Sequence, residues 1–241
     1  MASPANRFHP TKELLHANYL QVLDRIELAA ATSGRLGQDV KMIGVTKYVD
    51  ASVARWLVEF GCQNLGESRP QVLWEKADEL SILPVKWHLI GHLQRNKARR
   101  TLALVTAMHS LDSIRILEQI RLDCLNRDQP LQLLLEMNVS GDPTKTGMMI
   151  PEAEELLTTW QSDPKNHSSL EMVGLMGMGS LEGGKDQARR DFESLRILRD
   201  RWAVRFGLPL KELSMGMSDD FEAAIEEGAT MVRIGSILFA D

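Results

Sequence analysis

The chain has 241 residues, of which 44% are hydrophobic, and its formal net charge at pH 7 is −5. A chain of this size can bury a complete core, and one α/β domain is a simpler expectation than two small ones. The acidic balance excludes a general attraction to nucleic acid or to anionic membranes, so any phosphate site must be local. The sequence shows neither a secretory signal nor a stretch of membrane-spanning length, which predicts a cytoplasmic protein.

The first predicted element is a helix over residues 11–32. Its apolar residues recur at helical spacing, namely Leu14, Leu15, Tyr19, Leu20, Leu23 and Ile26. We interpret this helix as an extra cap on the domain that follows.

Beyond this helix, eight short apolar runs alternate with amphipathic segments. The runs cover residues 40–48, 62–68, 85–91, 106–112, 131–139, 170–178, 211–217 and 230–239. Helix-like segments such as residues 51–60 and 186–206 separate them. Eight strand–helix units match a closed (β/α)8 TIM barrel, so we predict one α/β barrel domain within residues 1–241, with no linker or low-complexity tract.

Cysteines are few, and neither Cys62 nor Cys124 lies in a Cys-x-x-Cys arrangement. This pattern argues against a disulfide framework and against a zinc–thiolate site. We expect both thiols to be reduced and structural.

A lysine stands near the end of the first predicted strand, in the stretch IGVTKYV. Barrels place their functional groups at the C-terminal ends of the strands, and Lys47 lies there. One interpretation is a lysine whose stem reaches past the apolar surface to solvent. The other is an imine-forming lysine, whose amine must be partly neutral through burial or a nearby cation.

The last two predicted strands and the helix start between them occupy residues 213–236, LSMGMSDDFEAAIEEGATMVRIGS. Ser218 or Asp219 would serve as an ordinary helix N-cap. In a barrel, however, the loops after the last two strands form a recurrent phosphate site. The predicted cofactor-binding residues here are Ser214, Gly216, Met217, Ser218, Arg233, Gly235 and Ser236. Because the eighth strand closes against the first, this site would lie beside Lys47, as pyridoxal 5′-phosphate (PLP) requires.

These motifs resemble those of the pyridoxal phosphate homeostasis proteins, the PLP-binding barrel family. The resemblance runs through IGVTKY, WHLIGHLQRNK, MNVSGDPTKTGM, GLMGMG and LSMGMSDDFEAAIEEGATMVRIGSILF, in the family's order. It implies a barrel similar to the N-terminal domain of alanine racemase, with PLP as a Schiff base on Lys47. It also implies two alternatives for Arg233, which would face either the phosphate or the pyridine nitrogen. Ser68 departs from the asparagine that many members carry.

Three other motifs carry less weight. His88 and His92 are four residues apart, but strand spacing separates them too far for a shared metal, and we expect no metal site. The basic run at residues 94–100 lacks the aromatic residues of single-strand binders, so we expect a solvated helix face and no nucleic acid. Lys145 lies in the loop after the fifth strand and could contact a ligand or simply face solvent.

Three functions fit the sequence. The first is a PLP-binding protein that holds the vitamer without robust catalysis and takes part in PLP homeostasis, with apo-enzymes as possible recipients. The second is a PLP-dependent amino-acid racemase, and the third is a cofactor-free Schiff-base aldolase, against which the family resemblance argues. In alanine racemases a tyrosine of a C-terminal β-domain supplies the second base. Here Tyr48 should point away from Lys47 if the strand pleat continues, so we expect no robust catalysis. We also expect a monomer.

Overall fold

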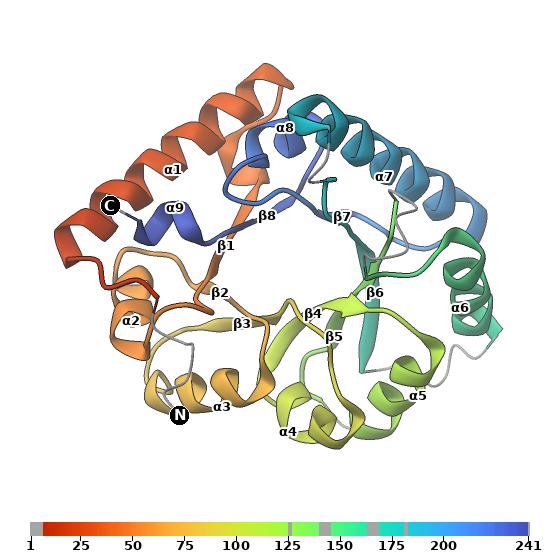
Figure 1. Cartoon of the computed structure of the whole chain (residues 1–241). Coiled ribbons are helices and arrows are strands. Elements are labelled where there is room, and N and C mark those ends of the chain that lie inside the picture. Colours follow the sequence, from red (N-terminus) through yellow and green to blue (C-terminus); the bar gives the residue numbers. More distant parts are fainter. Residues whose placement is uncertain (1–6, 125–126, 140–145, 163–168, 181–182, 241) are drawn as a thin grey trace.

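The computed structural model describes residues 7–124, 127–139, 146–162, 169–180 and 183–240. Eight parallel strands pair in chain order, and β8 also pairs with β1, so that the sheet closes into a barrel (Figure 1). The strands are β1 Lys41–Val45, β2 Asn64–Glu67, β3 Lys86–Leu89, β4 Val105–Leu111, β5 Leu131–Glu136, β6 Leu170–Met176, β7 Glu212–Ser214 and β8 Met231–Ile234. This architecture confirms the predicted (β/α)8 barrel, and each strand lies within or beside its predicted run.

Helices surround the barrel, as the 3.6-residue periodicity of the intervening segments predicts. The α-helices are α1 Lys12–Thr32, α2 Ala51–Glu59, α3 Pro70–Glu79, α4 Ala98–Leu102, α5 Ile114–Asp123, α6 Ile150–Ser162, α7 Gly184–Phe206, α8 Phe221–Glu226 and α9 Ser236–Phe239. Two 3-10 turns, η1 Gly37–Asp39 and η2 Arg95–Lys97, complete the described elements. Among the helices of the described ranges, none has both the length and the apolar character needed to cross a membrane.

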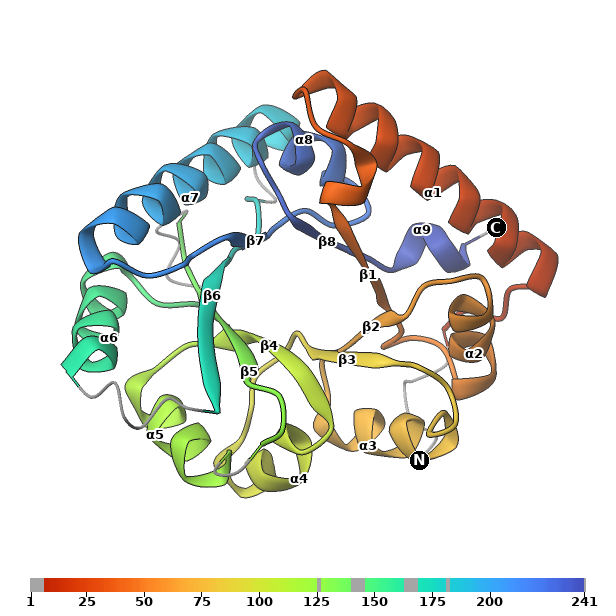
Figure 2. The same ribbon diagram turned by 180° about the vertical axis from the view of Figure 1, so that it is seen from behind.

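Helix α1 lies along the outside of the barrel against α8 and α9, as both views show (Figures 1 and 2). It begins at the N-cap Thr11, whose hydroxyl accepts from the Leu14 N–H at 3.2 Å. The Asn18 amide donates to the carbonyl oxygens of Leu238 and Ala240, at 3.2 and 3.0 Å. Because α9 has only four residues, α1 covers the flank of the barrel that a longer eighth helix would cover.

The buried face of α1 differs in part from the predicted stripe. Leu15, Tyr19 and Ile26 are buried as expected, but the side chains of Leu20 and Leu23 are 47% and 37% exposed. The reason is that α1 packs on one flank only, so leucines outside the narrow inward stripe face solvent.

The buried side chains are of two kinds, apolar and polar. An aliphatic layer lies between the strands and the helices, as in other barrels of this type. Several polar side chains are buried as well, among them His88, His109, Ser214 and Arg233. The alternation of side chains along parallel strands therefore turns polar groups into the barrel interior as well as aliphatic ones.

Candidate functional site

Lys47 lies in the turn that follows β1, at the C-terminal end of the barrel. The strand ends at Val45, and the Val49 N–H donates to the Thr46 carbonyl at 3.1 Å, which closes a tight turn. The Lys47 side chain is half-buried, and its Nζ lies 4.9 Å from the centroid of the Tyr48 ring. The prediction that Tyr48 points away from Lys47 is therefore wrong, because the turn interrupts the strand pleat.

A buried ion pair between Lys76 and Glu67 stabilises this turn. The Lys76 ammonium donates to Glu67 Oε1 at 2.5 Å and to the Thr46 carbonyl at 2.6 Å, and the Thr46 hydroxyl donates to the same carboxylate oxygen at 2.7 Å. The side chains of Lys76 and Glu67 are only 5% and 0% exposed. Thr46 directly precedes Lys47, so the pair fixes the backbone that carries the candidate imine-forming amine.

The turn after β7 carries Gly216, Met217 and Ser218. Gly216 has φ +88°, and a side chain there would bring Cβ within 2.5 Å of the Ala224 methyl carbon, so the turn requires glycine. The Met217 N–H donates to the Asp220 carboxylate at 2.6 Å. Helix α8 begins at Phe221 with Asp220 as its N-cap residue, so the prediction of Ser218 or Asp219 as the N-cap is wrong.

The turn after β8 lies against the turn after β7. The Gly235 N–H donates to the Ser218 hydroxyl at 3.3 Å, and Ser236 begins α9. Because β8 pairs with β1, Gly235 also approaches Val45, the last residue of the strand before Lys47. Both predicted phosphate loops therefore lie at the same end of the barrel as Lys47.

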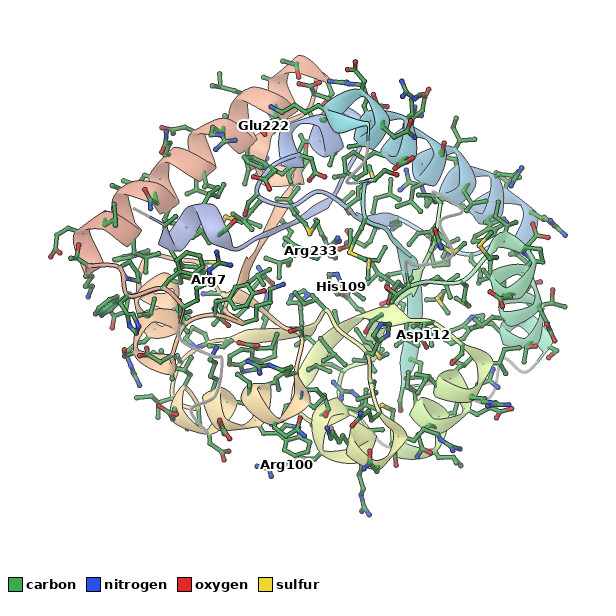
Figure 3. The ribbon with its side chains drawn as sticks, viewed as in Figure 1. Arg7, Arg100, His109, Asp112, Glu222 and Arg233 are labelled. Atoms are coloured by element: carbon green, nitrogen blue, oxygen red, sulfur yellow. The ribbon has the colours of Figure 1, made fainter. Side chains whose placement is uncertain are left out.

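Arg233 points into the barrel rather than toward these two turns. Its Nη1 donates to the carbonyl and the hydroxyl of Ser214 at 2.7 and 2.8 Å, and its Nη2 donates to the Gly177 carbonyl at 3.0 Å. Figure 3 shows Arg233 and His109 together inside the ring of strands. Burial, against the opposing charges of Asp220 and Glu136, lowers the pKa of Arg233 to about 10, so the guanidinium stays charged at neutral pH.

A row of hydrogen bonds continues from Ser214 through the barrel. His109 Nδ1 lies 2.7 Å from the Ser214 hydroxyl, His109 Nε2 lies 2.9 Å from His88 Nδ1, and His88 Nε2 lies 3.2 Å from Asn64 Oδ1. Burial, with smaller contributions from Lys41 and Lys86, lowers the pKa of His88 to about 3. Burial also holds the pKa of His109 well below its usual value. Both imidazoles are therefore neutral at pH 7.

Acidic groups line the opposite side of the same barrel end. Glu136, the last residue of β5, is 3% exposed and accepts from the Thr146 hydroxyl at 2.5 Å. His92 Nδ1 donates to Asp112 at 2.9 Å, and donor atoms of His92, Asp112 and Glu136 lie within 4.8 Å of one another. His88 and His92 therefore have separate hydrogen-bond partners.

The structure brings some of the predicted site residues together and separates others from them. Lys47 and the two turns share one end of the barrel, whereas the Ser214 hydroxyl is fully buried and bonded to His109 and Arg233. Ser68 is half-buried, two residues before Pro70, which begins α3. Lys145 lies outside the described residues.

The sequence reasoning missed the groups behind the site, including Glu67 and Lys76. The signal for Glu67 was a carboxylate inside the apolar run 62–68. Two-residue alternation along the predicted strands could likewise have placed His88 and His109 inside the barrel.

Comparisons with known proteins agree with this geometry. Residues 27–241 match the family model described as "Alanine racemase, N-terminal domain". The chain is 36% identical to a pyridoxal phosphate homeostasis protein of Aquifex aeolicus, over 92% of this chain and 95% of that protein. It superposes on PipY of Synechococcus elongatus, solved with PLP bound, with a TM-score of 0.79 and 29% identity, covering 91% of this chain and all of that one.

Alanine racemase of Clostridium difficile shares the fold alone. It superposes with a TM-score of 0.67 at 15% identity, over 95% of this chain and 57% of the racemase. The family match and the close relatives agree along nearly the whole chain. The chain therefore belongs to the family of pyridoxal phosphate homeostasis proteins.

Proposed function

We propose that this protein binds PLP as a Schiff base on Lys47 and holds it without robust catalysis, as part of intracellular PLP homeostasis. The relatives at 33–36% identity carry the name of that function, and PipY has been solved with PLP bound. The observation that carries the proposal is the position of Lys47 in the turn after β1, at the same end of the barrel as the two turns after β7 and β8. PLP would supply a reactive aldehyde that a lysine amine can capture.

The residues present fit the phosphate of PLP. Ser236 begins α9, and the first N–H groups of a helix have no acceptor within the helix. The adjoining turn from Gly216 to Ser218 adds a hydroxyl, which already contacts the Gly235 N–H at 3.3 Å. Backbone N–H groups and hydroxyls are the donors that a phosphate accepts from at such turns. We assign the phosphate to these two turns.

We assign Arg233 to the ring of PLP rather than to its phosphate. Its Nη1 and Nη2 atoms already bind Ser214 and the Gly177 carbonyl, inside the barrel. Turning the guanidinium toward the phosphate turns would break these bonds and leave a buried charge without its acceptors. In this assignment Ser214 acts by holding Arg233, not by contacting the phosphate.

The substitution Lys47→Ala tests the proposal. We expect the near-visible absorption of the bound PLP to vanish while the far-ultraviolet circular dichroism stays unchanged, because Lys47 is a half-buried turn residue outside the core. The matched control is Lys76→Arg, which keeps the charge of the second lysine near this turn. A Lys47→Ala protein that stays yellow after dialysis would show that another lysine holds the aldehyde.

A further inference from the structure

The interior row of polar groups ends at a cavity on the far side of the barrel. The cavity has a volume of about 300 Å³ and lies among the first residues of the strands. The residues that line it include Lys41, Asn64, Lys86, His88, Thr106 and Gln132. Strand starts form the N-terminal face of a barrel, so this cavity lies opposite Lys47 and the phosphate turns.

The chemistry of the cavity suits an anion. Two lysines and three carboxamide residues line it, and none of the described residues that line it is acidic. Lys41 has one acidic neighbour, Glu212, at 3.8 Å. Lys86 forms no ion pair with any described residue, although the protein as a whole has a net charge of −5. A cavity that gathers cations and amide donors on an acidic protein selects for a small oxyanion.

The row of hydrogen bonds connects this cavity to Arg233, and the donor and the acceptor of each bond in the row can be assigned. Asn64 Oδ1 can only accept, so His88 must donate from Nε2 and, being neutral, must accept at Nδ1. His109 then donates from Nε2 and accepts the Ser214 hydroxyl proton at Nδ1. The Ser214 oxygen in turn accepts from Arg233. Every donor in the row therefore points from Arg233 toward the cavity.

We propose that the N-terminal cavity binds a phosphate-type oxyanion through Lys41 and Lys86, and that the row Asn64, His88, His109, Ser214 transmits its charge to Arg233. The inference rests on the proposed function, because Arg233 is assigned to PLP there. An anion next to the two lysines offsets their positive field on His88, and neutral hydrogen-bonded groups in a low-dielectric interior polarise one another. Binding at one end then changes the electrostatic environment of the ring at the other, and the coupling is reciprocal.

The test uses the PLP-loaded protein, in which the phosphate turns are already filled. Inorganic phosphate is titrated at low ionic strength, with heat as one readout and the absorption of the bound PLP as the other. We expect one saturable site and a parallel change in the spectrum. Lys86→Met should weaken phosphate binding by roughly tenfold or more, because a charge-assisted contact is lost. The control Lys211→Met, an exposed lysine after α7, should leave both readouts unchanged.

Two results overturn the proposal. If phosphate gives no saturable heat, or binds equally well to the Lys86→Met protein, the cavity is not an anion site. If phosphate binds but the absorption stays constant, the row does not transmit the charge. A failure of the proposed function is distinguishable, since the protein would then lack PLP absorption before any phosphate is added.

Discussion

Arg233 keeps a positive charge where only 5% of the residue is exposed. We expect Arg233→Gln to lower PLP affinity by about 2–4 kcal/mol, the range for losing one partner of a buried charged contact. Because the hydrogen bonds of Arg233 hold its guanidinium in the barrel interior, the loss of affinity should be similar for PLP and for unphosphorylated pyridoxal. Titrating both vitamers against both proteins measures this. A loss confined to PLP would place Arg233 on the phosphate instead.

The pair Lys76 and Glu67 braces the turn that carries Lys47. We predict that Lys76→Met destabilises the protein by about 3–5 kcal/mol, because it leaves the Glu67 carboxylate buried without its cation. The double variant Lys76→Met/Glu67→Gln should recover much of that loss. Urea unfolding measures the stability, and the rate of PLP capture reports on the Lys47 turn. If the single and double variants are equally unstable, the ion pair is not the stabilising element.

The two thiols, Cys62 and Cys124, are buried and free, as the sequence predicts for both. Burial raises the pKa of Cys62 to about 12 and that of Cys124 to about 11. In the unfolded chain these thiols ionise near pH 8.5–9, so folded stability should fall as pH rises from there toward 11–12. Comparing the pH dependence of unfolding for the native protein and Cys62→Ala checks this. The variant should show the shallower fall, and parallel curves would contradict the assignment.

At the scale of single elements, the turn between β7 and α8 depends on Gly216. Gly216→Ala combines an unfavourable φ of +88° with a Cβ only 2.5 Å from the Ala224 methyl carbon. We expect a loss of about 2–4 kcal/mol in stability together with weaker PLP binding. The matched control is Gly34→Ala, at φ +70° with no atom within 4 Å, which should lose about 1 kcal/mol and keep PLP affinity. Equal effects at both glycines would refute the steric argument.

The helices and strands could be predicted from the sequence where the pattern that indicates them lies within one segment of the chain. Strand and helix positions follow from alternation and helical periodicity, and Pro70 marks the start of α3. The turn that brings Tyr48 beside Lys47 was not predictable by continuing a pleat, since β1 ends two residues earlier than Lys47. The contacts of Glu67 with Lys76, and of His88 with His109, depend on strand register and on side chains from separate elements. Periodicity within one segment contains no information about either.

At the scale of the molecule, the two ends of the barrel carry different kinds of polar group. The strand ends near Lys47 gather backbone donors and hydroxyls, whereas the strand starts gather Lys41 and Lys86. A polar row joins the two ends through an interior that barrels usually fill with aliphatic side chains. Burying these groups is favourable only when their hydrogen bonds are satisfied, and the row provides a partner for each imidazole nitrogen.

The whole site also limits what a bound amino acid could undergo. Racemisation needs acid/base groups on opposite faces of the reacting carbon, each within about 3–3.5 Å, hence about 6–7 Å apart. The sequence has two tyrosines, and Tyr48 lies in the same turn as Lys47, with its ring centroid 4.9 Å from Lys47 Nζ. Because both side chains come from adjacent residues of one turn, we expect them to reach the same face of a bound ring. We predict that the PLP-loaded protein, incubated with L-alanine in D2O, exchanges the α-hydrogen without inverting the centre, and that Tyr48→Phe exchanges at a similar rate. Optical rotation and proton NMR measure the two processes. Inversion at roughly 1 per second or faster would make the protein a racemase and overturn the non-catalytic proposal.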